Sequence, residues 1–315
     1  MGGGGAAAPR QARRAPPLRL AGGGPHPLPG AVAALSFGRR AGAGAARRGR
    51  GSIGGAFAVA PGEGAVRFLV ISDIHGNLEA LRAVLAHAAR KRKDAVLFLG
   101  DAVGYGASPN QVIERLRAFR VPVLAVRGNH DRVALDASQG AFFFNTNARQ
   151  AAAWTASVLT TPNRHYLERL EAGPKVVAEG VAICHGSPAD EDEYLFTEAE
   201  ATQAMERLPA RVTFFGHSHV PCLFERSPGS YGAVGVLLRG SRIVLDLDEE
   251  RTYLINPGSV GQPRDRDPRA AYAMYDSASG RLTLYRVPYD IDGARRRIIA
   301  AGLPTVLGDR LYHGA

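Results

Sequence analysis

The side chains best suited to chemistry lie at the ends of short apolar runs. The run from Phe68 to Ile71 is followed almost at once by Asp73 and His75. A buried parallel strand reads as a continuous hydrophobic run, and open α/β sheets place their chemistry just beyond the carboxyl ends of such strands. If strand geometry continues past Ile71, the side chains of Asp73 and His75 lie on the same side of the chain. A carboxylate oxygen and an imidazole nitrogen directed at one point suit a divalent metal ion.

Similar polar tips follow later apolar runs. They contain Asp101, Asn129, His130, His185, His217 and His219. Taken singly, each residue has an ordinary explanation: Asp73 could cap a helix and Asp101 could close a turn. A lone histidine at a strand end is more often a surface or core residue than a ligand. Because five of the nine histidines lie in these tips, a single shared site is the favoured interpretation.

The apolar runs alternate with segments of helical periodicity. Helices are expected at 78–93 and 109–119, a more irregular helical region at 140–172, and a short helix with a tail at 291–311. Strands are expected at 66–72, 95–99, 121–126, 176–183, 211–215, 235–247, 252–255, 271–276 and 282–287. Strands that alternate with helices and are then followed by more strands indicate an α/β protein with two packed sheets and helices outside.

Length and composition limit the class of protein. The chain has 315 residues, 45% of them hydrophobic, which is ample for a core within one folded domain. No apolar run is as long as a membrane span, so no membrane partner is expected. Cys184 and Cys222 lie far apart and suggest neither a disulfide framework nor a zinc ribbon, which favours a cytoplasmic location.

The positive charge is concentrated in the first part of the chain. Residues 1–62 contain nine arginines and no acidic residue, so they account for nine of the ten net positive charges. Residues 1–64 are rich in glycine, alanine, proline and arginine and are expected to be a disordered tail before a domain at 65–315. Alternatives for the tail are a nucleic-acid-binding arm, an organelle transit peptide, a twin-arginine export signal and a start codon assigned too far upstream. A dispensable tail is favoured, and nucleic acid is not an expected partner of the nearly neutral domain.

The five polar tips resemble, in order, the signature blocks of the calcineurin-like metallophosphoesterases. These blocks are Asp73-Ile74-His75, Gly100-Asp101, Gly128-Asn129-His130-Asp131, His185-Gly186 and Gly216-His217-Ser218-His219. The resemblance covers residues 67–290 and is closest to a small bacterial and archaeal, phosphodiesterase-like branch. Members of that branch also carry an Asn-Pro-Gly-Ser block, here Asn256 to Ser259. The resemblance implies a four-layer αββα sandwich and metal-dependent phosphatase or phosphodiesterase activity.

The resemblance also implies a dinuclear metal centre. One metal would be bound by Asp73, His75 and His219, and Asp101 would bridge it to the other. The other metal would be bound by Asn129, His185 and His217. A shared carboxylate can hold two cations about 3.5–4 Å apart, the spacing of a two-metal phosphoryl-transfer site. Mixed carboxylate and imidazole ligands suit manganese, iron, nickel or zinc better than magnesium, and manganese is the first expectation.

The expected mechanism uses a hydroxide held between the two metals. The metals would lower the pKa of a bridging water, and the resulting hydroxide would attack phosphorus in line with the leaving oxygen. His130 is left over after ligation, and the resemblance implies that it stabilises or protonates the leaving group.

The second block departs from that of calcineurin-type protein phosphatases. Those proteins carry Gly-Asp-x-x-Asp-Arg-Gly, in which the second Asp orients the catalytic histidine and the Arg holds phosphate. Here both are missing from the stretch Gly100 to Gly106. A doubly charged phosphomonoester therefore lacks its bidentate clamp, which favours a phosphodiester substrate. Asp131 could orient His130 instead.

The arginines after the Asn-Pro-Gly-Ser block have two interpretations. Arg264, Arg266 and Arg269 could reach a substrate phosphate, or they could form a solvated face with Asp265 and Asp267. The solvated face is the favoured interpretation.

The sequence thus predicts a two-metal phosphoesterase that acts on a small phosphorylated substrate such as a nucleotide. A phosphomonoesterase or a dinucleoside polyphosphate hydrolase is the alternative enzyme. A scaffold of the same fold is disfavoured because all seven ligand positions and His130 are filled. A nuclease recruited through the basic tail is the remaining alternative.

Overall fold

The structure, a computed structural model, describes residues 66–139 and 144–315. The expectation of a disordered tail at 1–64 lies outside the described residues. Within the described part, none of the helices combines the length and the apolar character needed to cross a membrane.

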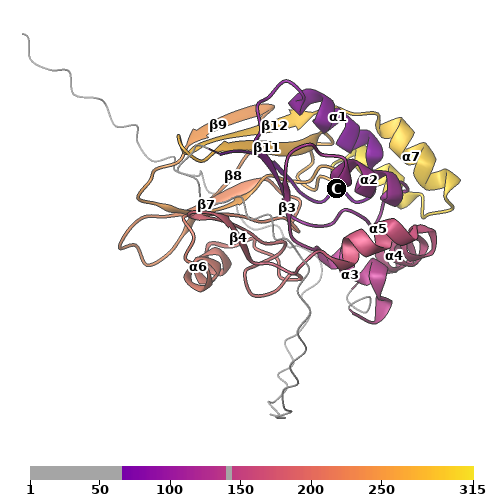
Figure 1. The fold of residues 1–315 in the computed structure, drawn as a ribbon, viewed down its shortest axis with the longest axis horizontal. Helices are drawn as coiled ribbons and strands as arrows, with labels where there is room; N and C mark the ends of the chain where they lie inside the picture. Colours follow the sequence, from indigo (N-terminus) through magenta and orange to yellow (C-terminus); the bar gives the residue numbers. More distant parts are fainter. Residues whose placement is uncertain (1–65, 140–143) are drawn as a thin grey trace, which may run out of the picture. The chain divides into compact units, whose positions relative to one another are not determined.

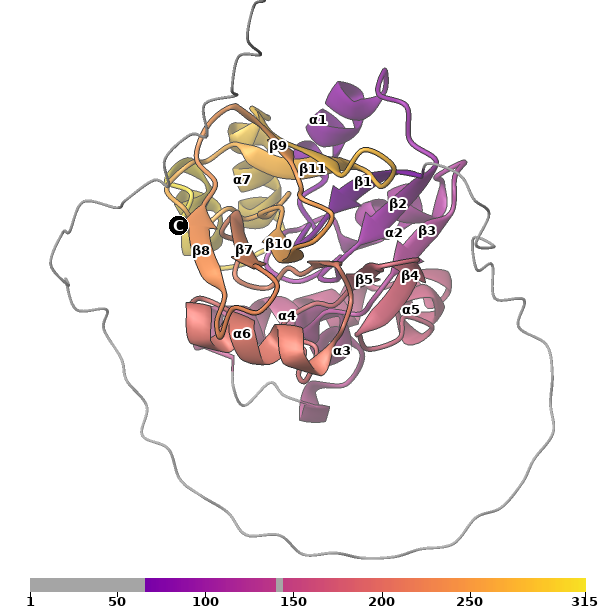
Figure 2. The same cartoon turned by 90° about the vertical axis from the view of Figure 1, so that its left-hand side faces the viewer.

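Two six-stranded sheets lie at the centre of the fold (Figures 1 and 2). The first has the order β3-β2-β1-β11-β12-β9 and the second the order β4-β5-β6-β10-β7-β8. Strands β1 to β3 are parallel to one another, as are β5, β6 and β10. The strand bounds are β1 Arg67–Ile71, β2 Ala95–Phe98, β3 Val123–Ala125, β4 Lys175–Ala178, β5 Val181–Ile183, β6 Val212–Phe214, β7 Cys222–Arg226, β8 Val234–Leu237, β9 Arg242–Asp246, β10 Thr252–Asn256, β11 Ala270–Asp276 and β12 Arg281–Val287.

Helices cover the outer faces of both sheets. Helices α1 and α2 pack on the first sheet, and α6 packs on the second (Figure 1). The result is the four-layer αββα sandwich that the resemblance implies. The helix bounds are α1 Leu78–Ala88, α2 Pro109–Arg117, α3 Asn129–Leu135, α4 Thr146–Val158, α5 Thr161–Glu168, α6 Glu198–Arg207, α7 Ile291–Ala300 and α8 Val306–Asp309, with short 3₁₀ turns at Ala137–Gln139 and Arg310–Tyr312.

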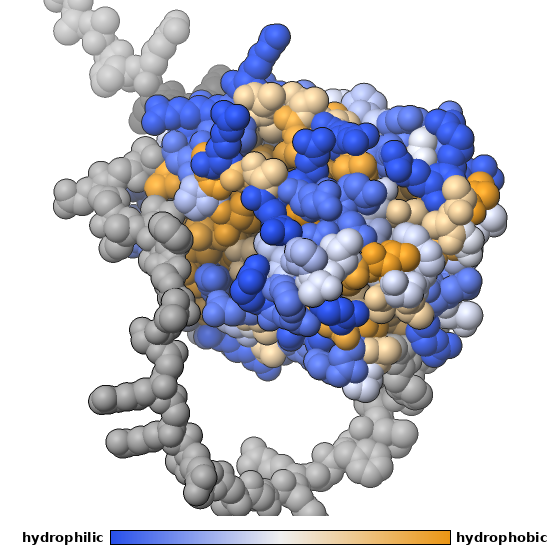
Figure 3. All heavy atoms as spheres, turned by 45° about the vertical axis from the view of Figure 1, so that its right-hand side comes forward, coloured by the Kyte–Doolittle hydropathy of each residue, from blue (hydrophilic) through white to orange (hydrophobic). Residues whose placement is uncertain are grey.

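Strand β1 illustrates why its sequence is apolar throughout. Successive side chains of a strand point to opposite faces of the sheet. Phe68 and Val70 accordingly lie in the core between the two sheets, whereas Leu69 and Ile71 pack against the helices. Each such burial contributes about 1.5–3 kcal/mol. On the face drawn in Figure 3, hydrophilic residues predominate, a hydrophobic area lies in a hollow at the left, and smaller apolar groups lie elsewhere.

Several elements differ from the expectations. Helix α6 and strand β7 were not predicted, and the single strand expected at 235–247 is two strands, β8 and β9, in different sheets. Helix α3 begins at Asn129, shortly after β3 ends at Ala125, so the third polar tip includes the first turn of a helix. Helix α6 has a detectable start signal, because Thr197 and Glu200 form a capping box.

Candidate metal centre

The predicted site residues meet at one edge of the two sheets, where parallel strands end. Asp73 and His75 follow β1, Asp101 follows β2, and Asn129 follows β3 in the first sheet. In the second sheet His185 follows β5, and His217 and His219 follow β6. All seven side chains are buried.

Six of these residues form two overlapping groups of possible metal ligands. The first group is Asp73, His75, Asp101 and His219, and the second is Asp101, His185 and His217. In each group the potential ligand atoms lie within 4.8 Å of one another. Asp101 belongs to both groups, which is the arrangement expected of a bridging carboxylate.

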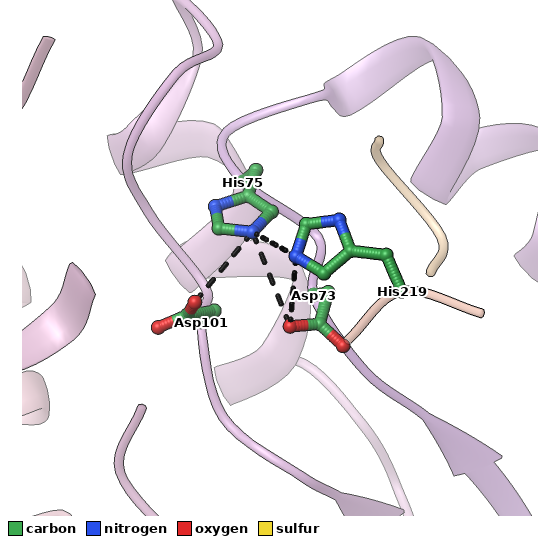
Figure 4. Close-up of side chains that lie close together, drawn as sticks. All are labelled: Asp73, His75, Asp101 and His219. Atoms are coloured by element: carbon green, nitrogen blue, oxygen red, sulfur yellow. Dashed lines mark hydrogen bonds and ion pairs between the residues drawn. The ribbon is translucent and has the colours of Figure 1, made fainter. Parts of the chain in front are cut away.

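Figure 4 shows how the first group converges. The Nε2 atoms of His75 and His219 are 3.0 Å apart. An oxygen of Asp73 lies 3.3 Å from Nε2 of His219, and an oxygen of Asp101 lies 3.5 Å from Nε2 of His75. In the second group, Nε2 of His185 lies 3.3 Å from Oδ2 of Asp101, the residue that the two groups share. Within each group, the ligand atoms are close enough together for a single cation to contact all of them.

Asn129 joins the second group through a neighbour. Its Oδ1 atom lies 3.3 Å from Nε2 of His185. An amide oxygen can bind a cation alongside carboxylate and imidazole ligands. The third polar tip therefore brings its predicted ligand to the same place as the others.

Three imidazoles are held in the tautomer that suits metal binding. The Nδ1 atoms of His75, His185 and His219 lie 3.1, 2.7 and 2.6 Å from backbone carbonyl oxygens. An Nδ1–H that donates to a carbonyl leaves the Nε2 lone pair directed into the centre. His217 differs, because its Nε2 lies 3.2 Å from the carbonyl oxygen of Asp192. Binding through that nitrogen requires this hydrogen bond to be displaced.

The backbone at the site corrects one step of the sequence argument. Strand geometry does not continue past Ile71, because Asp73 and His75 have φ values of 53° and 50°. Asp101, His217 and His219 are also left-handed, with φ values of 59°, 63° and 59°. The left-handed region costs a residue with a side chain roughly 1–2 kcal/mol. Such strain clusters at functional sites, where surrounding contacts hold it in place.

Hydrogen bonds between the loops hold these conformations. The backbone N–H groups of Ile74 and His75 both donate to the carbonyl of Asp101, at 2.9 and 3.0 Å. The N–H of His217 donates to Oδ1 of Asp73 at 3.2 Å. These bonds connect the loops after β1, β2 and β6, so the site is positioned by contacts between loops that are distant in sequence.

The Asn-Pro-Gly-Ser block also holds the site together. The amide of Asn256 donates to the carbonyl of Gly216 at 2.6 Å and to Oγ of Ser218 at 3.0 Å. The hydroxyl of Ser259 donates to the carbonyl of Asp73 at 2.8 Å. The block therefore supports the histidine loop after β6 and the aspartate loop after β1, a role that sequence reasoning did not assign to it.

The buried oxygens of the centre suit cations. Oδ2 of Asp73 and Oδ2 of Asp101 have no hydrogen-bond donor among the described residues. Burial alone would raise the pKa of both carboxyls, but His219 beside Asp73 and His185 beside Asp101 hold both pKa values well below the ordinary range. Burial lowers the pKa of His75 well below its ordinary value. Ionised carboxylates and neutral imidazoles are the protonation states that bind metal. His185 differs, because burial would lower its pKa but the charge of Asp101 raises it to about 10, so a cation bound there would displace a proton.

His130 lies beside the centre and is oriented by packing. Its ring centroid is 4.5 Å from that of Tyr105 and 4.3 Å from that of Phe144. A Cβ atom on Gly104 would lie 2.5 Å from Nδ1 of His130, so the ring rests against the bare glycine. Burial lowers the pKa of His130 to about 4, although the charge of Asp101 opposes the shift. The imidazole is therefore neutral near pH 7, with one N–H to donate.

The expectation that Asp131 orients His130 is wrong. The Asp131 carboxylate accepts hydrogen bonds from the backbone N–H groups of Asp101, Gly128 and Val103, at 2.9, 3.2 and 3.2 Å. It therefore fixes the loop that carries Asp101. Asp131 is next to His130 in the sequence, but helix α3 turns the two side chains in different directions.

A cavity of about 400 Å³ opens over the centre. Its walls include Asp101, Asn129, His130, His217 and His219 from the predicted site. Sequence reasoning assigned no place here to other lining residues, among them Tyr105 and Tyr194, and it disfavoured Arg264. A volume of this size holds a small organic substrate.

Arg264 corrects the expectation of a solvated arginine face. Arg269 does pair with Asp267, at 2.6 Å, as expected. Asp265 instead pairs with the buried Arg286, and Arg264 lines the cavity. The argument against doubly charged substrates considered only the loop after β2, whereas Arg264 lines the cavity from another loop.

Residues 66–280 match the calcineurin-like phosphoesterase superfamily domain. The chain belongs to this family. The family uses divalent metals, which agrees with the buried clusters of aspartate and histidine, and membership identifies the protein as a phosphoesterase-type hydrolase.

Individual relatives support the assignment to the phosphodiesterase-like branch. The chain is 37% identical over 252 residues to uncharacterized protein MJ0912 of Methanocaldococcus jannaschii, which covers 78% of this chain and 97% of that protein. It is 26% identical over 224 residues to phosphodiesterase YfcE of Escherichia coli K12, covering 67% and 88% of the two chains. The structure of a metallophosphoesterase from Sphaerobacter thermophilus is 36% identical, with a TM-score of 0.69, and covers 80% of this chain and 100% of the other. The expected family and fold are thus confirmed.

Proposed function

We propose that this protein is a dinuclear-metal phosphoesterase that hydrolyses a phosphodiester. The observation that carries the proposal is the position of Asp101, whose carboxylate belongs to both ligand groups. The similarity of the chain to a protein named phosphodiesterase supports the choice of a diester substrate. Asp73, His75 and His219 would hold one cation, Asn129, His185 and His217 the other, and Asp101 both.

The chain positions the reaction, and the cations supply the Lewis acidity. Two divalent cations bound by these residues would supply Lewis acidity toward a phosphoryl oxygen and would lower the pKa of a coordinated water. The donor set favours manganese, iron, nickel or zinc, with manganese as the first choice. The loops after the five strands fix the ligand side chains through buried hydrogen bonds, so little reorganisation is needed when substrate binds.

His130 is the side chain placed to act on the leaving group. It lines the cavity beside Asp101 without belonging to either ligand group. A neutral imidazole donates one N–H, and a hydrogen bond to the leaving oxygen stabilises the charge that develops there. The packing of Tyr105 and Phe144 against the ring limits its movement.

A nucleotide substrate, including a dinucleoside polyphosphate, is the second candidate. The rings of Tyr194 and Phe196 are stacked, with centroids 5.3 Å apart and planes inclined by 8°. Tyr194 lines the cavity and stacks on His217 at 4.0 Å, while Phe196 is 59% exposed. Exposed aromatic rings provide a surface on which a base can stack.

The decisive experiment measures hydrolysis of bis(p-nitrophenyl) phosphate after the protein has been stripped of metal. Manganese, nickel, zinc, iron or magnesium is then added back, and metal content is measured in parallel. We expect manganese to restore turnover. In Asp101→Asn both metal binding and turnover should be lost, because both cations lose their shared anion.

Asp136→Asn is the matched control. Asp136 is an acidic residue outside the cavity, with its carboxylate bonded to Ser138 and Gln139. Its removal should leave metal binding and turnover unchanged. Stoichiometric metal binding without turnover on diesters or monoesters would reject the enzymatic proposal and favour a scaffold, whereas failure to bind metal would reject the ligand assignment.

A further inference from the structure

Arg264 is a cationic side chain inside the cavity of the proposed centre. It lies in the segment that follows the Asn-Pro-Gly-Ser block, and its backbone N–H donates to the carbonyl of His219 at 3.4 Å. The same segment is tied to Asp73, because the N–H of Gly261 donates to the Asp73 carbonyl at 2.9 Å. The arginine is therefore fixed to two of the loops that carry proposed ligands.

In the described part of the chain, the side-chain hydrogen bonds of the Arg264 guanidinium go to neutral groups. Its Nη2 donates to Oε1 of Gln262 at 3.0 Å and to the hydroxyl of Tyr105 at 3.4 Å. Its Nε is buried and has no hydrogen-bond partner among residues 66–139 and 144–315. No carboxylate in these residues lies within ion-pair distance of it, unlike Arg269 and Arg286 nearby. Partly buried charge without a counter-ion is costly unless a ligand supplies one.

A second arginine, Arg310, lies near the Tyr105 ring, although it is not among the residues that line the cavity. The guanidinium groups of Arg264 and Arg310 lie 5.8 and 6.0 Å from the centroid of the Tyr105 ring. Burial and the charge of Arg264 lower the pKa of Arg310 below its ordinary value. Two cations held near one ring create a local field that favours an anion.

Phosphate is the anion that fits the remaining donors. A guanidinium presents a planar fork of N–H groups that matches two phosphate oxygens. We propose that Arg264 binds the second negative charge of a phosphoryl group in this cavity, so that the site accepts doubly charged phosphomonoesters as well as phosphodiesters. The inference rests on the proposed phosphoesterase function. Arg264 would hold phosphate in place of the arginine that the loop after Asp101 lacks, although Arg264 lies in a different loop.

The test compares two substrates with the same leaving group and different charge. Turnover of p-nitrophenyl phosphate and bis(p-nitrophenyl) phosphate is measured with manganese-loaded protein. In Arg264→Gln, the ratio of kcat/KM for the monoester to that for the diester should fall about 10- to 100-fold, the usual effect of losing a charged hydrogen bond. Arg264→Lys should restore part of the ratio, because it keeps the charge and loses the fork. Arg266→Gln is the matched control, since Arg266 is an exposed arginine two residues away and should leave the ratio unchanged.

A binding measurement separates this inference from the proposed function. Orthophosphate and dimethyl phosphate are titrated calorimetrically into the manganese-loaded protein. Orthophosphate should bind about tenfold more weakly to Arg264→Gln than to wild type, and dimethyl phosphate should be affected less. Arg264-dependent phosphate binding without turnover would reject the enzymatic proposal and support this inference. Diester turnover with no orthophosphate binding, or with a monoester-to-diester ratio unaffected by Arg264→Gln, would overturn it.

Discussion

At the scale of single residues, the centre depends on which atom of each side chain faces inward. A histidine binds a cation only through an unprotonated nitrogen, and an Nδ1–H that donates to a backbone carbonyl determines that this nitrogen is Nε2. His75, His185 and His219 are held in this way. Residue type alone could predict the ligands, but the partner carbonyls come from other loops, so the tautomers could not be read from the sequence.

A substitution at His130 tests catalysis separately from metal binding, because His130 is not one of the proposed ligands. In His130→Ala we expect both metals to remain bound, because the seven ligand positions are intact. The kcat for bis(p-nitrophenyl) phosphate should fall about 10²- to 10⁴-fold, the usual contribution of a positioned proton donor or acceptor. Metal content by mass spectrometry and steady-state kinetics on the same samples check both parts.

The control for His130 is an exposed histidine outside the cavity. His165, on helix α5, has a side chain that is 58% exposed and lies outside the cavity. His165→Ala should match wild type in both measurements. Turnover at the wild-type rate in His130→Ala would remove His130 from the mechanism.

At the scale of elements, a glycine in the loop between β2 and α2 determines where His130 can lie. Gly104 has a φ of 94°, and a Cβ there would come within 2.5 Å of Nδ1 and 3.0 Å of Cγ of His130. Gly104→Ala should therefore displace the ring. Since a shift of about 1 Å in a catalytic group can cost about 100-fold, we expect kcat to fall by that order while metal content stays unchanged.

Gly302 provides the control for backbone strain. It also has a positive φ, 70°, but a Cβ there meets no atom within 4 Å. Gly302→Ala should lower the free energy of unfolding by roughly 1–2 kcal/mol, as measured by urea denaturation, without changing kcat. If both variants keep wild-type kcat, the packing of Gly104 against His130 does not position the ring for catalysis.

The position of the site could be predicted from the sequence, because parallel strands bring their carboxyl ends to one edge of a sheet. The apolar runs before Asp73 and Asp101 were sufficient for that step. Arg264 could not be placed in this way, since it contacts Tyr105 across 159 residues through a loop without periodic structure. Strand β7 was missed because Glu225 and Arg226 interrupt its apolar pattern.

At the scale of the whole fold, the proposed centre connects the two sheets. Its ligands follow β1, β2 and β3 in the first sheet and β5 and β6 in the second. The two sheets share a hydrophobic core, which includes Val70 and Leu97 from one side and Ile183 and Phe214 from the other. Cations bound between the loops would add a polar connection at the edge of this core, so metal binding and stability of the fold should be coupled.

This coupling predicts that metal raises the melting temperature. A ligand that binds only the folded state adds about 2.7 kcal/mol at a concentration of 100 Kd. For a domain of about 150–250 residues, each kcal/mol shifts Tm by roughly 2–4 °C, so manganese should raise Tm by several degrees relative to metal-stripped protein.

If the centre draws on both sheets, Asp73→Asn from the first and His185→Ala from the second should each remove most of this increase. His313→Ala, a change at an exposed histidine near the end of the chain, should retain it. Scanning calorimetry with and without manganese makes the comparison, and an increase that survives in either ligand variant would show that the corresponding sheet does not contribute to the centre.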